Sequence, residues 1–409
     1  MKIDTMRRVD RLAGIPLCLL LTLLLRCKEI FSKPNPQPPH NVLFIELSEM
    51  GSAILVDPAM RKMQRERNAQ LHFLIFNSNA ASLRLLNTVP QENVFAIREN
   101  SFLSLVLDSI RFIFWARQRR IDTVIDLELF SRYSALLTGA SGARNRIGFH
   151  AFENEGLYRG AMLTHRVAYN PHLHIAKNFI ALVNAALASK VEIPFSKTLI
   201  EDSEVKLSRA VIDESKLAAL HGRIGDIYPA YDEQRHRVVL INPNASDLLP
   251  QRRWMPEHFV AVMKSLLAEN DDVLILITGA TAERGGAEAL LRQVQHERCL
   301  NFAGCNSLDE LPALYQLAEL MLTNDSGPGH FSSVTDLRTF VIFGPETPLL
   351  YGSLGNSTPI YAGLACSPCV SAANHRKTPC TDNVCLQVIT PEKVLDHLRP
   401  YLAERRHRA

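Results

Sequence analysis

Residues 320–348 read LMLTNDSGPGHFSSVTDLRTFVIFGPETP. The pattern predicts a buried strand at Leu320–Thr323, a polar loop, a short helix, and a second buried strand at Thr339–Phe343. The loop, Asp325–His330, contains a carboxylate, a hydroxyl, two glycines and an imidazole. Its glycines lack a Cβ, so the backbone can lie close to a ligand. Because free amide groups at the start of a helix attract anions, this stretch predicts a phosphate-binding loop.

A simpler reading of the loop is a strand-to-helix connection in which Asp325 or Ser326 caps the helix. Capping does not require an imidazole on the first helical turn, so we favour the ligand site. A serine hydrolase is not favoured, because Asp-Ser-Gly lacks the G-x-S-x-G pattern. The loop residues that we expect to contact the ligand are Asp325, Ser326, Gly327 and His330.

From Asn41 onward, apolar runs alternate with helical patterns, which predicts an α/β fold with parallel sheets covered by helices on both faces. Polar, irregular sequence interrupts the alternation, so we predict domains at 41–200 and 237–409 joined by residues 201–236. The other predicted strands are Val42–Leu47, Leu71–Phe76, Val94–Ile97, Thr123–Asp126, Arg237–Ile241, Val273–Thr278 and Cys299–Phe302. Helices are predicted around Ser101–Arg119, His174–Ala188 and Glu204–Leu220.

Polar clusters follow four strands of the second half, at the carboxyl end of each. Open α/β sheets bind ligands at this edge, so the clusters predict one ligand rim. The clusters are Asn242–Ser246, Gly279–Glu283, Asp325–His330 and Gly344–Pro348.

Arg252 and Arg253 lie in the loop before a helix that begins at Pro256. They could be a solvated charge pair, but arginine on this rim can neutralise a diphosphate with paired hydrogen bonds, and we favour that role. Glu283 could accept hydrogen bonds from a ribose or be an ordinary helix-start glutamate. No D-x-D pair occurs, so no divalent metal site is predicted, and the charge of a departing diphosphate falls to Arg252, the helix amides and His330. Asn244 and Ser246 precede these arginines on the same rim.

The loop after the first strand, Ser48–Ser52, is the counterpart in the first half. Gly51 permits a tight turn, and Ser52 could cap the helix that follows. Glu46 and Glu49 are the carboxylates that could accept a proton there.

Composition excludes some classes of protein. A net charge of +3 over 409 residues, without a basic stripe interleaved with aromatics, argues against nucleic-acid binding. The chain contains 8 cysteines, too few for a disulfide framework at this length. The series Cys366-x2-Cys369-x10-Cys380-x4-Cys385 resembles metal-ligand spacing, but its gaps do not match a standard zinc ribbon. We therefore favour reduced thiols packing a loop-rich tail over zinc binding.

Residues 12–25, LAGIPLCLLLTLLL, are apolar and have cationic flanks. They are shorter than the roughly 20 residues of a spanning helix. Their flanks favour a helix lying on an anionic membrane surface, while a short spanning helix, a signal segment and a buried helix are the alternatives. The proline-rich stretch Ser32–His40 would separate this anchor, within residues 1–40, from the folded part.

Several motifs together resemble one known family. N-x-N-A-S from Asn242, R-R-W-x-P-E-H-F from Arg252, N-D-S-G-P-x-H from Asn324 and F-G-P-x-x-P from Phe343 are similar to glycosyltransferase family 9, the ADP-heptose:lipopolysaccharide heptosyltransferases. The resemblance runs from about Asn41 to Tyr401. It includes Arg146–Phe149, His174, Asn178 and Cys366–Cys369.

The resemblance implies the GT-B architecture, in which two Rossmann-like domains face a cleft, with the acceptor in the first half and the nucleotide-sugar donor in the second. It implies a metal-independent, inverting transfer from a nucleotide-diphosphate sugar such as ADP-heptose to a lipid-linked glycan. Together with the apolar segment at residues 12–25, the resemblance implies that the protein acts at the cytoplasmic face of a bacterial inner membrane. By motif, Arg252 occupies the position of the family's diphosphate-binding lysine or arginine. The remaining donor-binding matches are Asn244, Ser246, Asp325, Ser326, Gly327 and His330.

One departure concerns the general base. The family usually reads M-G-D after the first strand, whereas this chain reads Met50-Gly51-Ser52. A serine cannot accept a proton at neutral pH without help. Either Glu49 or Glu46 takes over, the acceptor geometry differs, or activity is lost; we favour Glu49. Two functions compete with transfer. One is a sugar-nucleotide epimerase on the same architecture, and the other, suggested by the missing aspartate, is a non-catalytic nucleotide-sugar binder.

Overall fold

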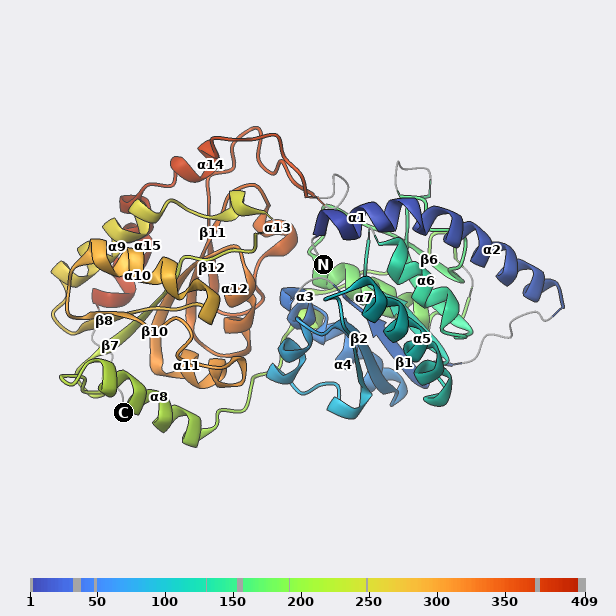
Figure 1. The fold of residues 1–409 in the computed structure, drawn as a ribbon, viewed down its shortest axis with the longest axis horizontal. Coiled ribbons are helices and arrows are strands. Elements are labelled where there is room, and N and C mark those ends of the chain that lie inside the picture. The colour runs from blue at the N-terminus through green and yellow to red at the C-terminus, as the bar shows by residue number, and fades with distance from the viewer. Residues whose placement is uncertain are drawn as a thin grey trace. The chain divides into compact units, whose positions relative to one another are not determined.

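The computed structural model describes residues 3–31, 38–47, 50–129, 131–152, 157–190, 192–247, 249–371 and 376–403. The chain divides into two compact units, Met1–Lys206 and Leu207–Ala409. Each contains a parallel sheet with helices on its faces (Figure 1). The expected α/β class is thereby confirmed.

The first unit is built on a six-stranded sheet with the order β3-β2-β1-β4-β5-β6, and all of its neighbouring strands pair in parallel. The chain reverses its direction of travel across the sheet after β3, so β1 and β4 flank the switch point. The strands are β1 (Asn41–Ile45), β2 (Gln70–Phe76), β3 (Val94–Ile97), β4 (Thr123–Asp126), β5 (Asn145–His150) and β6 (His165–Ala168).

Two helix layers cover this sheet. Right-handed crossovers put α5 and α6, which follow β3 and β4, on the face opposite to α4, which follows β1. Helix α7 packs on β4, β5 and β6 and beside α4. The helices are α1 (Ile3–Leu12), α2 (Gly14–Phe31), α3 (Met50–Leu55), α4 (Asp57–Arg67), α5 (Phe102–Gln118), α6 (Arg132–Ala140) and α7 (Ile175–Leu187).

The apolar segment at residues 12–25 belongs to α2, which packs along α6 (Figure 1). Cys18 lies in a small core with Ala135 and Met162, and the Thr22 hydroxyl accepts a hydrogen bond from the amide of Ala161 at 3.0 Å. No helix in the described ranges combines the length and apolarity that a bilayer crossing requires. Attachment of this segment to a membrane stays a prediction, and residues 32–37 of the expected spacer lie outside the described part.

The second unit repeats the design with the strand order β12-β11-β10-β7-β8-β9, again all parallel. Its apolar core joins the inner faces of β7, β8 and β10 to α9 and α15. The strands are β7 (Arg237–Asn242), β8 (Val273–Ile277), β9 (Cys299–Asn301), β10 (Ala318–Asn324), β11 (Arg338–Phe343) and β12 (Ser357–Tyr361). The helices are α8 (Glu214–Ile227), α9 (Pro256–Glu269), α10 (Arg284–Val294), α11 (Leu311–Leu317), α12 (Gly327–Phe331), α13 (Pro348–Tyr351), α14 (Val384–Gln387) and α15 (Pro391–Ala403).

Three strands were not predicted: β5, β6 and β12. Strand β5 reads NRIGFH, which lacks an apolar run. Its buried Arg146 is satisfied by the carbonyl oxygens of Met162 and Ala143. The helix expected at Glu204–Leu220 begins later, at Glu214, because Asp213 caps it by accepting from the amide of Ser215 at 3.0 Å.

Candidate functional site

The second sheet has its switch point between β7 and β10. The chain visits β8 and β9 on one side of β7 and then crosses to β10 on the other side. Asn324 ties the two strand ends together, because its side-chain amide donates to the carbonyl of Pro243 at 2.8 Å. The side-chain oxygen Oδ1 of Asn324 accepts a hydrogen bond from the backbone amide of Trp254 at 3.0 Å. A ligand crevice is expected at this position in a doubly wound sheet.

Arg252 lies at this rim between two carboxylates. Its Nη2 atom is 3.4 Å from Oε1 of Glu346, and its Nε atom is 3.7 Å from Oδ2 of Asp325. All three side chains are largely removed from solvent, with exposed fractions of 15%, 3% and 5% for Arg252, Glu346 and Asp325. The structure therefore brings together two predicted site residues and one acid that the sequence did not single out.

Two atoms in this group lack a hydrogen-bond partner: Nε of Arg252 and Oδ2 of Asp325 are both buried and unpaired. Their separation of 3.7 Å is too long for a hydrogen bond. Buried polar atoms are nearly always satisfied in folded proteins, and each exception requires an explanation. A bound polar group that uses these atoms is such an explanation.

A second arginine and an aromatic ring complete the group. Nε of Arg376 is 3.4 Å from Oε1 of Glu346, and its guanidinium carbon lies 5.2 Å from the ring centre of Tyr351. Glu346 belongs to the F-G-P-x-x-P motif, so its place at the end of β11 was visible in the sequence. Its partner Arg376 was not, because no local pattern links the two.

Burial and charge shift the proton affinities here. Burial raises the pKa of Asp325, and the charge of Arg252 opposes that shift. For Glu346, burial raises the pKa to about 7; Arg252 opposes this and Asp325 adds to it. Burial acts to lower the pKa of Arg252, but Asp325 and Glu346 outweigh it, so the pKa is raised. Burial thus favours the protonated forms of the two acids, while Arg252 stays charged.

The loop after β10 differs in detail from the expectation. Helix α12 is a single turn, and Ser326 does not cap it; its hydroxyl donates instead to the carbonyl of Asn324 at 3.1 Å. A Cβ at Gly329 would lie 3.2 Å from Cγ2 of Val341, so packing within the protein already favours glycine there. His330 is buried on α12. Binding of a phosphate at this loop stays a prediction, for which Arg252 is the nearest described cation.

Most of the other residues predicted to bind the nucleotide-sugar donor make hydrogen bonds with nearby backbone groups. The Asn244 side chain donates to the carbonyl of Thr278 at 3.1 Å, and Ser246 is exposed on the same loop. Arg253 donates to the carbonyl of Ala245 at 3.0 and 2.7 Å, which occupies its guanidinium group in holding that loop. Oε2 of Glu283 accepts from the amide of Ala280 at 2.6 Å, as the helix-start alternative requires. Contact of these residues with a donor stays a prediction.

The predicted proton acceptors belong to the first unit. Glu46 directly follows β1 and is buried, and Ser52 lies on α3. Glu49 lies outside the described residues. Beside them, at the end of β4, Oε1 of Glu128 accepts from the amide of Leu47 at 2.9 Å.

Asp126 is another buried acid at the same strand end. Burial raises its pKa, and its ion pair with Arg159 opposes the shift. The string Asp126-Leu127-Glu128, at the end of a predicted strand, is the sequence signal for both acids. The first switch point therefore has more carboxylates than were predicted.

The carboxy-terminal cysteines are near one another but are not arranged as metal ligands. Burial raises the pKa of Cys385, and the neighbouring Cys369, Cys380 and Cys366 add to it. All four are free thiols. Within the described ranges, no three His, Cys, Asp or Glu side chains form a group that could hold a metal ion. Reduced thiols, rather than zinc ligands, stay the prediction for these residues.

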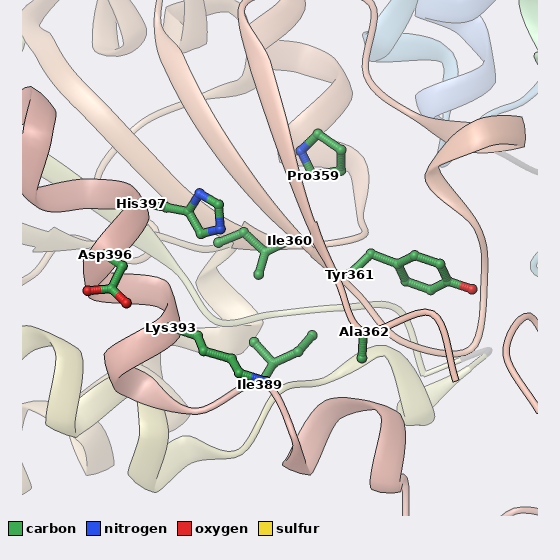
Figure 2. A pocket seen from close by; sticks show the side chains of 8 residues that line it. All are labelled: Pro359, Ile360, Tyr361, Ala362, Ile389, Lys393, Asp396 and His397. Carbon is green, nitrogen blue, oxygen red and sulfur yellow. The ribbon is translucent and has the colours of Figure 1, made fainter. Parts of the chain in front are cut away.

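A hollow of about 420 Å³ lies elsewhere in the second unit, between the edge strand β12 and α15 (Figure 2). Lys393, Asp396 and His397 reach it from α15, opposite Ile360 and Tyr361. It includes no predicted site residue, and Nζ of Lys393 already donates to the carbonyl of Val388 at 2.9 Å. We therefore place the candidate site at the β7/β10 rim.

Two Rossmann-like units in one chain, with a charged rim on the second, are the features of a GT-B glycosyltransferase. Within that class, the chain belongs to glycosyltransferase family 9 (heptosyltransferase), whose sequence profile matches residues 112–378. The resemblance stated from the motifs is thereby confirmed.

Individual relatives carry related names. The chain is 27% identical over 169 residues to lipooligosaccharide heptosyltransferase 2 of Campylobacter jejuni, a match that covers 41% of this chain and 51% of that protein. It is 23% identical over 249 residues to a lipopolysaccharide core heptosyltransferase of Haemophilus influenzae, covering 60% and 64%. The chain thus spans about half the length of the first of these curated relatives.

A solved structure has the same fold. The structure of the ADP-heptose lipopolysaccharide heptosyltransferase II of Escherichia coli aligns with a TM-score of 0.66 over 89% of this chain and 98% of that one, at 19% identity. At 19% sequence identity, this structural similarity shows that the two proteins share a fold.

Proposed function

We propose that this protein is a metal-independent, inverting glycosyltransferase that moves a sugar from a nucleotide-diphosphate sugar to a lipid-linked bacterial glycan. Family membership and the names of the relatives, which are heptosyltransferases of lipooligosaccharide or lipopolysaccharide, support this function. ADP-heptose is the first donor to test, and the core of lipopolysaccharide is the first acceptor. The cytoplasmic face of the inner membrane is the proposed place of the reaction.

The observation that carries the proposal is the unsatisfied pair Arg252 and Asp325 at the β7/β10 rim. Arginine forms paired, charge-assisted hydrogen bonds with phosphate oxygens. A diphosphate that binds Arg252 would weaken its attraction to Asp325 and Glu346. Because the pKa of Glu346 is already about 7, that acid can take up a proton as the anion arrives.

In the proposed reaction, an acceptor hydroxyl attacks the anomeric carbon of the sugar. The new carbon–oxygen bond forms as the bond to the diphosphate breaks, and the electron pair leaves with the diphosphate, so the configuration inverts. The hydroxyl proton passes to a carboxylate, for which we propose Glu49, with Glu46 as the alternative. Arg252 and His330 would stabilise the charge on the departing diphosphate.

The test is acceptor-dependent release of ADP. Purified protein is incubated with ADP-heptose, with and without a lipopolysaccharide acceptor that lacks core heptose. Release that requires the acceptor, together with a heavier acceptor in mass spectrometry, supports transfer. An isomerised donor without acceptor would indicate an epimerase, and donor binding without either product would indicate a non-catalytic binder; each of these outcomes contradicts the proposal.

A further inference from the structure

Helix α5 presents an apolar stripe to solvent. Leu103 and Phe114 have exposed fractions of 68% and 66%. The large exposed side chains recur three or four residues apart, so they lie along one side of the helix. The stripe consists of Phe102, Leu103, Val106, Leu107, Ile110 and Phe114.

The stripe belongs to a firmly packed helix. On the opposite side, Phe112 and Ala116 are buried in the core with the sheet. Asp108 is buried and receives two hydrogen bonds from the guanidinium group of Arg98, both at 2.8 Å. Ser101 caps the helix by accepting from the amide of Ser104 at 3.1 Å. The apolar side chains are therefore held in fixed positions at the surface.

Helix α2 presents a second stripe on the same helix layer. Its inner side is buried against α6, while Leu20, Leu23 and Leu24 on its outer side are exposed. Helix α6 contacts α5 on one flank and α2 on the other (Figure 1). Because α2 and α5 both pack against α6, the two exposed stripes border the same helix layer. Monomeric proteins rarely expose so many large apolar residues together.

The charges around this layer are one-sided. Exposed basic side chains on α1, α2 and α5 include Arg8, Arg11, Arg26, Lys28 and Arg117. Arg111 is also exposed, but it pairs with Asp108 at 3.2 Å. The described acidic side chains of these helices form ion pairs with basic side chains of the first unit.

Each of these acids has a basic partner within the first unit. Asp10 pairs with Arg132 at 3.2 Å, and Glu29 pairs with Arg146 at 3.3 Å. Asp108 pairs with Arg98. An apolar face bordered by exposed cations, of which the described acids pair with Arg111 alone, matches the surface of an anionic bilayer.

We propose that the outer side of the α2–α6–α5 layer docks on an anionic lipid bilayer, with α5 as an apolar contact in addition to the amino-terminal helix. A second copy of the chain fits less well, because two such basic faces would repel each other. The inference extends the proposed membrane association to a second element, and it does not depend on the proposed reaction.

The experiment measures binding of the full chain to vesicles by co-sedimentation, with phosphatidylcholine alone or mixed with phosphatidylglycerol. The test variant is Leu103→Ser/Leu107→Ser/Phe114→Ser. The matched control is Leu199→Ser/Val211→Ser, which removes side chains exposed by 84% and 93% outside this layer. All of the changed residues are exposed, so the variants should fold, which circular dichroism checks.

We expect the wild-type protein and the control to bind the phosphatidylglycerol vesicles, and the α5 variant to bind about tenfold or more weakly, because three apolar side chains no longer enter the lipid. Added salt should weaken wild-type binding. Equal binding by the α5 variant and the control would overturn the proposal, as would the absence of wild-type binding. Loss of a dimer in sedimentation equilibrium by the α5 variant, without any change in vesicle binding, would show instead that a second copy covers this face.

Discussion

Nε of Arg252 and Oδ2 of Asp325 face each other across 3.7 Å in the second unit, and both atoms are buried without a hydrogen-bond partner. The residues are far apart in sequence and meet because β10 lies beside β7 at the switch point. An unsatisfied buried pair of opposite charge is a costly arrangement in a resting protein. The arrangement becomes favourable when a ligand forms hydrogen bonds with both atoms. Measuring the affinity for the nucleotide-sugar donor therefore tests the role of Arg252 and Asp325.

Replacing Arg252 by lysine keeps the positive charge beside the two buried acids but removes the planar fork. We expect ADP to bind about 1.5–3 kcal/mol more weakly, the worth of a hydrogen bond to a charged group. Isothermal titration calorimetry measures this change, and Arg235→Lys, at an exposed position in the same unit, is the control. If Arg252→Lys binds ADP as tightly as the wild type, the diphosphate role of Arg252 is wrong.

The variant Glu346→Gln tests whether Glu346 is protonated in the folded protein. The pKa of Glu346 is raised from its ordinary value of 4.5 to about 7 by burial, so between these values the folded state holds a proton that the unfolded state has lost. Stability must therefore fall as pH rises through this window, by on the order of 2–3 kcal/mol for this group. The glutamine variant should lose that part of the pH dependence. Melting temperatures at pH 5 and at about pH 7.5 measure it.

Glu297→Gln, at an exposed position, is the control for this titration. It should keep the pH dependence of the wild type. A Glu346→Gln variant that follows the wild-type curve would mean that Glu346 is ionised in the fold at neutral pH.

Glu49→Gln addresses the proton acceptor. If Glu49 takes the hydroxyl proton, the variant should lose nearly all turnover, with donor affinity unchanged, because a carboxamide cannot act as a base. Steady-state kinetics and ADP calorimetry on the same preparations separate the two effects. Glu46→Gln is the companion variant. An active Glu49→Gln enzyme with an inactive Glu46→Gln enzyme would move the role to Glu46.

Gly329→Ala should destabilise the second unit. The new Cβ would lie 3.2 Å from Cγ2 of Val341 and 3.3 Å from Oγ of Ser353, so the neighbours must shift, at about 1–3 kcal/mol. Gly286→Ala in α10 is the matched control, because no atom lies within 4 Å of its added Cβ. Alanine should stabilise that helix by about 0.5–1 kcal/mol. Thermal unfolding followed by circular dichroism compares them, and equal melting temperatures would contradict the crowding at Gly329.

Local sequence was sufficient for much of the architecture. The apolar runs at β1, β7 and β10 are continuous because parallel strands are buried on both faces, and such runs are visible without any knowledge of partners. The polar loops follow directly at the strand ends, so their gathering on one rim could also be predicted. Strand β5, with its buried Arg146, could not, because its polar atoms are satisfied by residues on another loop.

The candidate site shows the same difference between what the sequence predicts and what only the folded chain reveals. The sequence determined that Arg252 and Asp325 belong to the rim, since each lies in a loop next to a strand end. Only the tertiary structure decided that Glu346 joins them, and that burial raises the pKa of this acid to about 7. The same holds for the apolar side chains that α2 and α5 expose beside α6. The physical reason is that side-chain periodicity records local conformation, whereas burial and charge–charge contacts arise between segments that meet only after the chain has folded.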